Sequence, residues 1–447
     1  MDPITNPYAP GAGQRPPELA GRDEYLRQFD VVLERIRRGR PDRSVLLTGL
    51  RGVGKTVLLN ALRSQAVRAN WGTGKLEARP DQSLRRPLAS ALHTAVRELG
   101  HPQQEDVDHV LGVVKAFAQR DAPANAKLRD RWSPGIDVPA VSGRADSGDI
   151  EIDLVELLTD VGGLAADVGK GVGIFIDEMQ DLGPDDVSAV CAAFHEIGQQ
   201  ALPVLVVGAG LPHLPAVLSA SKSYSERLFR YHRIDRLERS EAYRALQAPA
   251  ADEGAEWQDD ALAAMYAATG GYPYFIQAYG KEVWDLAPQS PITAEDVRVA
   301  APSAEAELAV GFFGSRYERA TPGEREYLRA MAEAAITVAE QEVAAESEGG
   351  NAGGGDPGNA PGAGQGADAG EAASEPVLSA ESRDPLTRAE EVEAVPTSVV
   401  AEVLGRKPQS LSPARDALMK KGLVYAPERG KIAFTVPHFG RYLRNSA

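Results

Sequence analysis

The stretch Gly49-Leu50-Arg51-Gly52-Val53-Gly54-Lys55-Thr56 fits the pattern G-x-x-x-x-G-K-[ST] and is the strongest fold signal in this chain. An apolar run precedes it at 43–48 and predicts a short buried strand. A second run follows at 57–62 and predicts the opening of a helix. A glycine-rich turn between strand and helix exposes backbone N–H groups and the positive end of the helix, which attract polyphosphate. All eight residues are therefore predicted to bind nucleotide phosphates.

The last two residues of this stretch have separate predicted roles. The Lys55 ammonium is expected to contact the β- and γ-phosphates, as a catalytic as well as a binding group. The Thr56 hydroxyl is expected to be a ligand of Mg²⁺. The alternative is a glycine-rich turn without ligand, which the complete pattern in its strand–helix context disfavours.

A second motif at 172–178 supports the same chemistry. Its apolar residues end in Asp177 and Glu178, which is typical of a central parallel strand buried on both faces. Ligands bind at the C-terminal ends of such strands. We therefore expect Asp177 to hold Mg²⁺ with Thr56, and Glu178 to orient and deprotonate the attacking water. ATP and Mg²⁺ are the ligands that the two motifs predict.

Composition places the chain among ordinary soluble globular proteins, since its 447 residues are 43% hydrophobic and 25% charged. No apolar run reaches the roughly 18 residues of a membrane-spanning helix, and residues 1–20 lack the apolar segment of a signal peptide. The single cysteine, Cys191, lies on an apolar helix face and is expected in the core. The histidines show no zinc-ligand spacing. A cytoplasmic protein without membrane contact is therefore predicted.

Charge is unevenly distributed along the chain, whose net charge is −16. Residues 346–393 contain eleven acidic and two basic residues, a net charge of −9. Residues 396–447 contain nine basic and three acidic residues, a net charge of +6. The C-terminal part is thus locally basic, so the acidic whole does not exclude nucleic-acid binding there.

Alternating strand and helix patterns predict an α/β core with a parallel sheet over 21–238, after an extended N-terminal lead at 1–20. Beyond the two motif strands, we expect strands at 75–79, 202–208 and 233–237. The stretch 100–150 combines one amphipathic helix with a polar part and is interpreted as an insertion or mobile loop. Residues 239–317 show helical patterns only, which predicts a separate helical lid.

Residues 318–447 are predicted to form a third domain, interrupted at 345–393 by a disordered segment rich in Gly, Ala, Asp and Pro. Helices expected at 397–404 and 410–421 precede a hairpin within 423–435. With the helix that begins the domain, this gives the order helix, helix, helix, hairpin. That order is typical of a winged helix-turn-helix.

Together these features resemble AAA+ ATPases of the origin-recognition-like group, which are related to archaeal-type and STAND ATPases. The segments that carry the resemblance are AGRDEYL, VLLTGLRGVGKTVLLN, GIFIDEMQDL, VVGAGLPHLP, SERLF, TGGYPYFIQAYG and LMKKGLVYAPERGKIAFTVPHFGRYL. They span most of residues 20–447, apart from 100–150 and 345–393. The resemblance implies a P-loop NTPase fold, with a parallel sheet, helices on both faces, a helical lid and a C-terminal winged helix.

The resemblance also implies a catalytic role for Arg227, which falls near the position of an arginine finger or sensor in such ATPases. A surface arginine in a helix is the alternative. Arg22 lies where the adenine pocket of these ATPases begins, and its role is expected to be structural.

Two departures from the family pattern bear on the rate of hydrolysis. The run 207–210 is Val-Gly-Ala-Gly, without the Asn, Ser or Thr that many relatives use to position water. The lid helix after Gly271 carries Lys281 as its nearby cation in place of a sensor arginine. Both departures favour a slow nucleotide switch over a motor.

Three functions remain open from the sequence. In the first, nucleotide state controls binding of double-stranded DNA by residues 396–447, whose candidate groove-facing residues are Gln409, Ser412, Arg415, Lys420 and Lys421. In the second, a STAND-like regulator uses its winged helix to contact a protein, or forms a nucleotide-dependent homo-oligomer. In the third, nucleotide is bound without hydrolysis.

Overall fold

The computed structural model describes residues 1–447 except 12, 121–135, 350–388, 390–391, 393 and 446–447. It divides into two compact units, Met1–Leu308 and Ala309–Ala447, each of which is described by itself below. The boundary between the units lies inside 239–317, the range expected for the lid. Among the residues described, no helix combines the length and the apolar composition that crossing a membrane would need.

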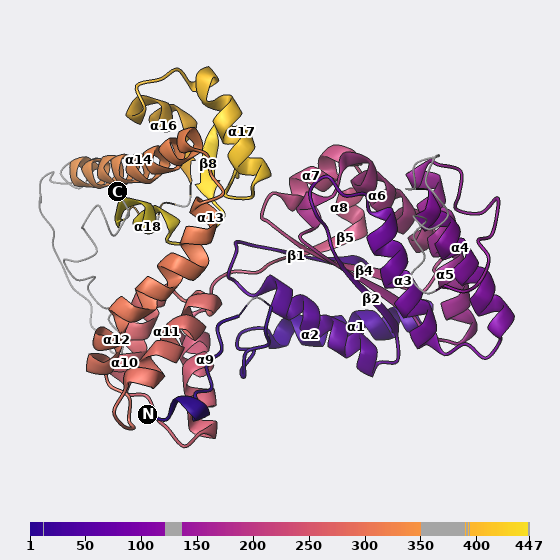
Figure 1. Ribbon diagram of the computed structural model, residues 1–447, viewed down its shortest axis with the longest axis horizontal. Helices are drawn as coiled ribbons and strands as arrows, with labels where there is room; N and C mark the ends of the chain where they lie inside the picture. The colour runs from indigo at the N-terminus through magenta and orange to yellow at the C-terminus, as the bar shows by residue number, and fades with distance from the viewer. Residues whose placement is uncertain (12, 121–135, 350–388, 390–391, 393, 446–447) are drawn as a thin grey trace, which may run out of the picture. The chain divides into compact units, whose positions relative to one another are not determined.

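Unit 1 contains a parallel five-stranded sheet in the order β2-β3-β4-β1-β5 (Figure 1). Its strands are β1 (Ser44–Thr48), β2 (Gly72–Glu77), β3 (Val172–Asp177), β4 (Val204–Gly210) and β5 (Phe229–Arg233). The three central strands β1, β3 and β4 are buried along their whole length, as their apolar runs predict. Because all strands run in the same direction, the ends of β1 and β3 lie at one edge, with β4 between them.

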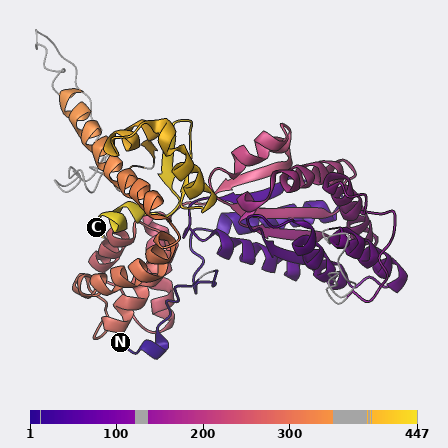
Figure 2. The same ribbon diagram turned by 45° about the horizontal axis from the view of Figure 1, so that its top comes forward.

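Alternate side chains of the strands face two separate hydrophobic clusters, one on each side of the sheet. Phe175 of β3 packs with α1 (Asp23–Arg37) and α2 (Lys55–Arg68). Ile174 and Ile176 of the same strand face the opposite layer. That layer contains α3 (Arg85–Leu99), α4 (Gln104–Gln119), α5 (Ile150–Asp167), α6 (Pro184–Gln199) and α7 (Leu214–Ser221). Helices therefore cover both faces of a parallel sheet (Figure 2), which confirms the expected α/β architecture.

Local sequence signals set several helix ends. The Asp149 side chain accepts from the N–H groups of Glu151 and Ile152 and caps α5. Pro184 occupies the first turn of α6, where its missing N–H costs nothing. Gly100 ends α3 with a φ of 62°. Each of these signals stands in the sequence where the helix begins or ends.

Strand β2 begins earlier than the expected 75–79, because two glycines serve packing here and do not mark a turn. A Cβ on Gly72 would lie 2.3 Å from the carbonyl oxygen of Ala95, and one on Gly74 would lie 2.5 Å from that of Ala91. The two glycines thus let the backbone of α3 approach the strand closely. The partner helix is remote from the glycines in sequence, so the local pattern did not reveal the reason.

Strand β5 covers Phe229–Arg233, so the expectation of a strand at 233–237 is wrong. β5 pairs only with β1 and is partly exposed along most of its length, which accounts for its polar sequence. The apolar residues Ile234 and Leu237 are buried in the connection that leads to the lid. The apolar residues of this connection therefore led to the wrong prediction of a strand, and the polar edge strand β5 was not predicted.

The described part of 100–150 contains the expected amphipathic helix, which is packed, and a segment at 136–149 that has no helix or strand. Val113, Val114 and Phe117 of α4 are completely buried between α3 and α5. The segment 136–149 then returns along the helices, and Val141 N donates to Gly112 O at 3.1 Å. Residues 121–135 lie outside the described part of the chain.

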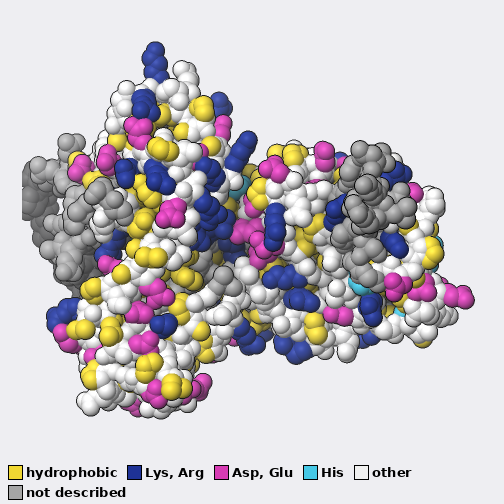
Figure 3. Space-filling view, viewed as in Figure 1, with side chains coloured by type: hydrophobic (Ala, Val, Ile, Leu, Met, Phe, Trp, Pro, Cys, Tyr) yellow, Lys and Arg dark blue, Asp and Glu magenta, His cyan; other side chains and the backbone are white. Residues whose placement is uncertain are grey.

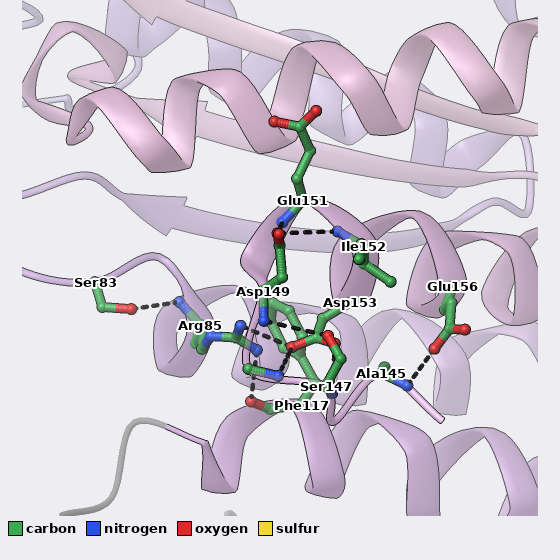
Figure 4. Close-up of polar contacts among 11 residues, drawn as sticks. Ser83, Arg85, Phe117, Ala145, Ser147, Asp149, Glu151, Ile152, Asp153 and Glu156 are labelled. Carbon is green, nitrogen blue, oxygen red and sulfur yellow. Dashed lines mark hydrogen bonds and ion pairs between the residues drawn. The ribbon is translucent and has the colours of Figure 1, made fainter. Parts of the chain in front are cut away.

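A buried ion pair between α3 and α5 also bonds to the segment 136–149 (Figure 4). Arg85 Nη2 donates to Asp153 Oδ2 at 2.7 Å, and the Arg85 guanidinium lies 4.8 Å from the centre of the Phe117 ring. Ser147 donates to Asp153 Oδ1 from both its N–H, at 2.8 Å, and its hydroxyl, at 2.6 Å. Gly148 N adds a bond of 3.2 Å to Oδ2. The carboxylate of Asp153 thus fastens α3, α5 and the 136–149 segment together.

The lid of unit 1 comprises α9 (Arg239–Asp252), α10 (Asp259–Thr269), α11 (Pro273–Leu286) and α12 (Ala294–Glu307). The N-terminal lead, whose 3₁₀ turn η1 covers Pro3–Thr5, is bound to it through Tyr8. The buried Tyr8 hydroxyl donates to Leu246 O at 2.6 Å and accepts from Trp257 Nε1 at 2.9 Å. Gly280 leaves room for the Tyr8 ring, since a Cβ there would lie 2.9 Å from the ring. The lead is therefore an ordered part of the lid.

Unit 2 follows the predicted order of helices and hairpin. After the π-helical turn η4 (Leu308–Gly314) and α13 (Ser315–Tyr317), its elements are α14 (Pro322–Gly349), β6 (Val395–Pro396), α16 (Thr397–Val403), η6 (Pro408–Leu411), α17 (Ser412–Lys420), β7 (Val424–Tyr425), β8 (Lys431–Phe434) and α18 (Phe439–Asn445). The strands form an antiparallel sheet in the order β6-β8-β7, so the expected hairpin is confirmed and β6 is additional. The segment expected to be disordered, 345–393, lies largely outside the described residues.

Candidate functional site

The loop between β1 and α2 has the backbone that a phosphate-binding turn requires. Gly52 and Gly54 have φ values of 85° and 89°, a left-handed conformation that residues with a Cβ rarely adopt. Gly49 lies against Ile234, where a Cβ would be 2.1 Å from the Ile234 carbonyl oxygen. α2 begins at Lys55, so its first N–H groups and positive end lie at this turn. The eight residues 49–56 therefore form one turn at a helix N-terminus.

Lys55 is buried within this turn. Its Nζ donates to the carbonyl oxygens of Gly49 at 2.9 Å and of Leu50 at 2.7 Å. Burial lowers the pKa of Lys55 to about 8, although the charge of Glu178 acts in the opposite direction. The ammonium is thus held at the loop by neutral carbonyl groups, and a polyphosphate would offer it charged acceptors instead.

Strand β3 brings Asp177 and Glu178 to the same edge of the sheet. Asp177 is buried, and its Oδ1 accepts from Glu178 N at 3.0 Å. Glu178 has a φ of 49°, which is uncommon for a residue other than glycine, and leads into the short turn η3 (Met179–Asp181). Arg51 Nη1 donates to Glu178 Oε1 at 2.9 Å. The two motifs, 127 residues apart in the sequence, therefore meet in an ion pair.

The surroundings of Glu178 keep its carboxylate charged. Burial opposes ionisation, but Arg51, Gln180 and Lys55 outweigh it and lower the pKa of Glu178. The Arg51 and Glu178 side chains remain 26% and 25% exposed, so the pair lies at an accessible edge. An ionised carboxylate at this place is able to accept a proton from water.

Gln180 belongs to the site, and our sequence analysis did not identify it. Its Nε2 donates to Glu178 Oε2 at 2.7 Å, and its Oε1 accepts from Leu211 N at 3.0 Å. It therefore links the carboxylate to the backbone that follows β4. The available signal was its position two residues after Glu178, on the turn that leaves the same strand.

The oxygen donors at this edge suit Mg²⁺. Thr56 stands in the first turn of α2 and Asp177 at the end of β3, where the Coulomb attraction of the Asp177 carboxylate acts on Lys55. Within the described chain, no group of three or more His, Cys, Asp or Glu side chains could hold a metal. Mg²⁺ needs no such cage, because it is commonly held by one or two side chains together with phosphate and water. Thr56 and Asp177 therefore fit the metal role that the sequence predicts.

Arg22 is a structural link beside the phosphate loop. Its buried Nη2 donates to Val53 O at 3.2 Å and to Asp235 O at 2.7 Å. The lid contacts the same loop, since Tyr274 N donates to Gly52 O at 3.2 Å. The loop is therefore fixed both from the N-terminal side and from the lid.

Lys281 and Arg227, the two further cations that the sequence singled out, have different surroundings. Lys281 donates to Glu282 and Asp285 at 3.2 Å each, on its own helix α11. Arg227 is exposed on α8 (Ser225–Leu228), which precedes β5. Because β5 runs parallel to β1, this start of β5 lies at the edge of the sheet opposite to the phosphate loop. Arg227 and the loop of the same chain are therefore not brought together.

In unit 2, basic side chains lie around α17 (Figure 3). The structure divides the residues expected to face DNA. Gln409 and Lys420 are exposed, and Ser412 is half-buried. Arg415 pairs with the neighbouring Asp416 at 3.0 Å. Lys421 donates to Glu324 Oε2 at 2.6 Å and to Arg319 O at 3.0 Å, so it holds α17 to the start of α14.

Residues 18–207 match the family model of the AAA ATPase domain. This part of unit 1 is therefore similar to an AAA ATPase domain. The family match and the phosphate loop both indicate nucleotide binding. The match also agrees with the ATPase fold expected from the sequence. Residues 310–351 and 381–443 match a domain of unknown function. No curated protein matches the chain.

Solved structures resemble the chain over nearly its whole length at low sequence identity. A Walker-type ATPase of Pyrococcus abyssi is 14% identical, with a TM-score of 0.52 and coverage of 96% of this chain and 97% of that one. The RuvB Holliday junction branch migration motor of Thermotoga maritima is 16% identical, with a TM-score of 0.40 and coverage of 94% and 96%. Cdc6p from Pyrobaculum aerophilum is 14% identical, with a TM-score of 0.39 and coverage of 100% and 99%. The similarity to the Pyrococcus abyssi ATPase supports the fold.

Proposed function

We propose that the protein binds ATP with Mg²⁺ and hydrolyses it in the AAA ATPase domain. The observation that carries this proposal is the 2.9 Å ion pair between Arg51 and Glu178, because it brings the phosphate loop beside the expected base. Thr56 and Asp177 would hold the metal, which neutralises phosphate charge when bound. Glu178 would then orient the attacking water and accept its proton.

Hydrolysis is proposed to be slow, so that bound nucleotide acts as a switch. β4 ends in Gly208-Ala209-Gly210, without a polar side chain of its own near the expected water. Lys281 of the lid is paired with acidic neighbours on its own helix. With few groups to stabilise the charge of the transition state, turnover loses its largest usual source of acceleration.

Arg227 is proposed to act on the nucleotide of a second copy of the chain. Its exposure and its place at the opposite edge of the sheet support an action in trans. An arginine supplied in trans is worth about 10³–10⁵ in turnover in well-studied nucleotide hydrolases. Turnover per molecule should therefore rise with protein concentration, and Arg227→Ala should abolish that rise.

Unit 2 is proposed to be a winged helix that binds double-stranded DNA through residues 396–447. The support is the net charge of +6, the order of the helices and hairpin, and the exposure of Lys420 and Gln409. Binding that rests on Lys and Arg contacts to phosphate weakens steeply as salt rises. Affinity for a duplex should therefore fall with a measurable salt slope and differ between ATP-bound and nucleotide-free protein.

Contact with a protein is the second candidate for unit 2, as in a STAND-like regulator. It is favoured by the ion pairs that occupy several of its basic residues, namely Lys421 with Glu324 and Arg406 with Glu326 at 3.0 Å. Cations committed in this way contribute less to DNA binding than their number implies. A cytoplasmic location remains a prediction from the sequence.

One experiment tests the proposed function as a whole. ATP turnover is measured for the wild type, Lys55→Ala and Glu178→Gln, each with and without duplex DNA. We expect slow turnover in the wild type, no detectable turnover in Lys55→Ala, a loss of roughly 100-fold or more in Glu178→Gln, and a change in the wild-type rate when DNA is added. Turnover without any DNA effect, in a protein that also fails to bind duplex at low salt, would favour the protein partner.

A further inference from the structure

The end of β4 is shaped to receive side chains from the turn after β3. A Cβ on Gly208 would lie 2.6 Å from Met179 Sδ, and a Cβ on Gly210 would lie 2.9 Å from Gln180 Oε1. Both partners belong to η3, directly after Glu178. Because β4 has glycine at 208 and 210, it supplies no polar side chain of its own here. The same glycines leave room for a polar side chain from the turn after β3.

Gln180 fills this space with an amide that has two partners. Its carbonyl oxygen accepts from Leu211 N at 3.0 Å, immediately after β4. Its NH₂ group donates to Glu178 Oε2 at 2.7 Å, opposite the oxygen that Arg51 contacts. A side-chain amide suits this place because it is a donor and an acceptor at once.

The two donors to Glu178 differ in how they respond to nucleotide. Arg51 belongs to the phosphate loop, so a bound triphosphate competes with Glu178 for its guanidinium. Gln180 is neutral and is tied to the backbone of Leu211, so phosphate does not compete for it in the same way. After ATP binds, Gln180 is the donor that still restrains the carboxylate.

We propose that Gln180 is a positioning residue, which holds the Glu178 carboxylate in place and anchors it to the backbone after β4. The inference rests on the proposed hydrolysis by Glu178 and assigns to Gln180 the positioning role that β4 itself does not supply. Misplacement of a catalytic group by about 1 Å costs as much as 100-fold in rate. Loss of this restraint should therefore reduce turnover without reducing the binding of ATP.

The test compares Gln180→Ala, Gln180→Glu and the control Gln200→Ala. Gln200 makes the same type of bond, from Nε2 to Glu196 Oε1 at 2.7 Å, but is exposed on the far end of α6. Gln180→Glu keeps an acceptor for Leu211 N, but it replaces the donor to Glu178 with a carboxylate and so adds a negative charge beside Glu178. We expect kcat to fall about tenfold in both Gln180 variants, with KM and ATP affinity unchanged within about twofold and no effect in the control.

A purely structural role gives a different result. If Gln180 only supports the backbone at Leu211, Gln180→Glu retains wild-type turnover, and the proposal is wrong. In a Glu178→Gln background the proposal predicts no further loss from Gln180→Ala, because the group being positioned is already gone. An undiminished loss in that background would also overturn it.

Hydrogen exchange at the Leu211 amide separates this inference from the proposed function. We expect faster exchange in Gln180→Ala and in Glu178→Ala, and near-normal exchange in Gln180→Glu, whether or not the protein hydrolyses ATP. If the wild type shows no turnover, the hydrolytic role fails together with the proposed function. If exchange at Leu211 is the same in the wild type and Gln180→Ala, the link itself is absent and the inference fails alone.

Discussion

Two of the arginine–carboxylate pairs of unit 1 are similar in length and opposite in character. Arg85 and Asp153 lie 2.7 Å apart with side chains 6% and 0% exposed, whereas Arg51 and Glu178 lie 2.9 Å apart with side chains 26% and 25% exposed. Asp153 also accepts from Ser147 and Gly148, so both its oxygens are fixed by the fold. Glu178 is held by Arg51 of the phosphate loop and by the amide of Gln180.

The difference shows that burial and partner count, more than distance, separate a structural ion pair from a responsive one. A buried pair loses its solvation in the folded state, so each partner depends on the other. A pair at an accessible edge keeps part of its solvation and yields to a competing anion. The first pair therefore fixes a helical layer, and the second is free to change with ligand.

The largest expected effect on stability comes from the buried pair. Asp153→Ala leaves Arg85 charged and without its carboxylate in the core, which we expect to cost about 3–5 kcal/mol in the free energy of unfolding. Denaturant unfolding measures this loss. The matched control is Asp160→Ala, whose bond to the partly exposed Arg144 should be worth less than about 1 kcal/mol. Equal losses in the two variants would remove the distinction.

The pair at the phosphate loop should respond in ligand binding instead. Arg51→Met keeps an unbranched apolar stem and removes the charge, so we expect the free energy of unfolding to change by less than about 1 kcal/mol. ATP affinity should fall about tenfold, since one charge-assisted phosphate contact is lost. Titration with a fluorescent ATP analogue measures the affinity. A variant that is strongly destabilised but binds ATP normally would contradict this assignment.

The smallest expected effect is on the rate at which a thiol reagent labels Cys191. Cys191 is buried in the layer that contains α5 and α6, and burial raises the pKa of its thiol to about 11. At pH 8 only about one thiol in a thousand is therefore ionised, and a thiol reagent should label the folded protein slowly. Labelling should accelerate as the pH rises towards 11. Asp153→Ala should accelerate labelling at pH 8, and Arg51→Met should leave it unchanged.

Contiguous motifs allowed the strands and the turn of the candidate phosphate site to be predicted from the sequence. The contacts inside the site could not be predicted in this way. The stretch 49–56 and the apolar run ending in Asp177 each carry their own pattern, so their residues and strands followed directly. The bond between Arg51 and Glu178 joins residues 127 positions apart, and no local pattern encodes such a contact. Gln180 stood beside the motif, but its importance depends on the backbone of Leu211 in another strand.

The same reasoning explains the errors in the fold. The strand expected at 75–79 left out Gly72 and Gly74, because the helix that needs their small size lies later in the chain. The polar strand β5 lacked an apolar run because it is an edge strand. The segment 136–149 has no helix or strand, as expected of a loop, but its bonds to Asp153 and α4 could not be predicted from periodicity within the segment.

The most direct test of the central claim measures ATP binding and ATP hydrolysis side by side in the wild type and Glu178→Gln. The account predicts slow hydrolysis by the wild type, a loss of roughly 100-fold or more in the variant, and equal binding of ATP with Mg²⁺ by both. Hydrolysis by Glu178→Gln at the wild-type rate would contradict the assignment of Glu178 as the residue that activates water.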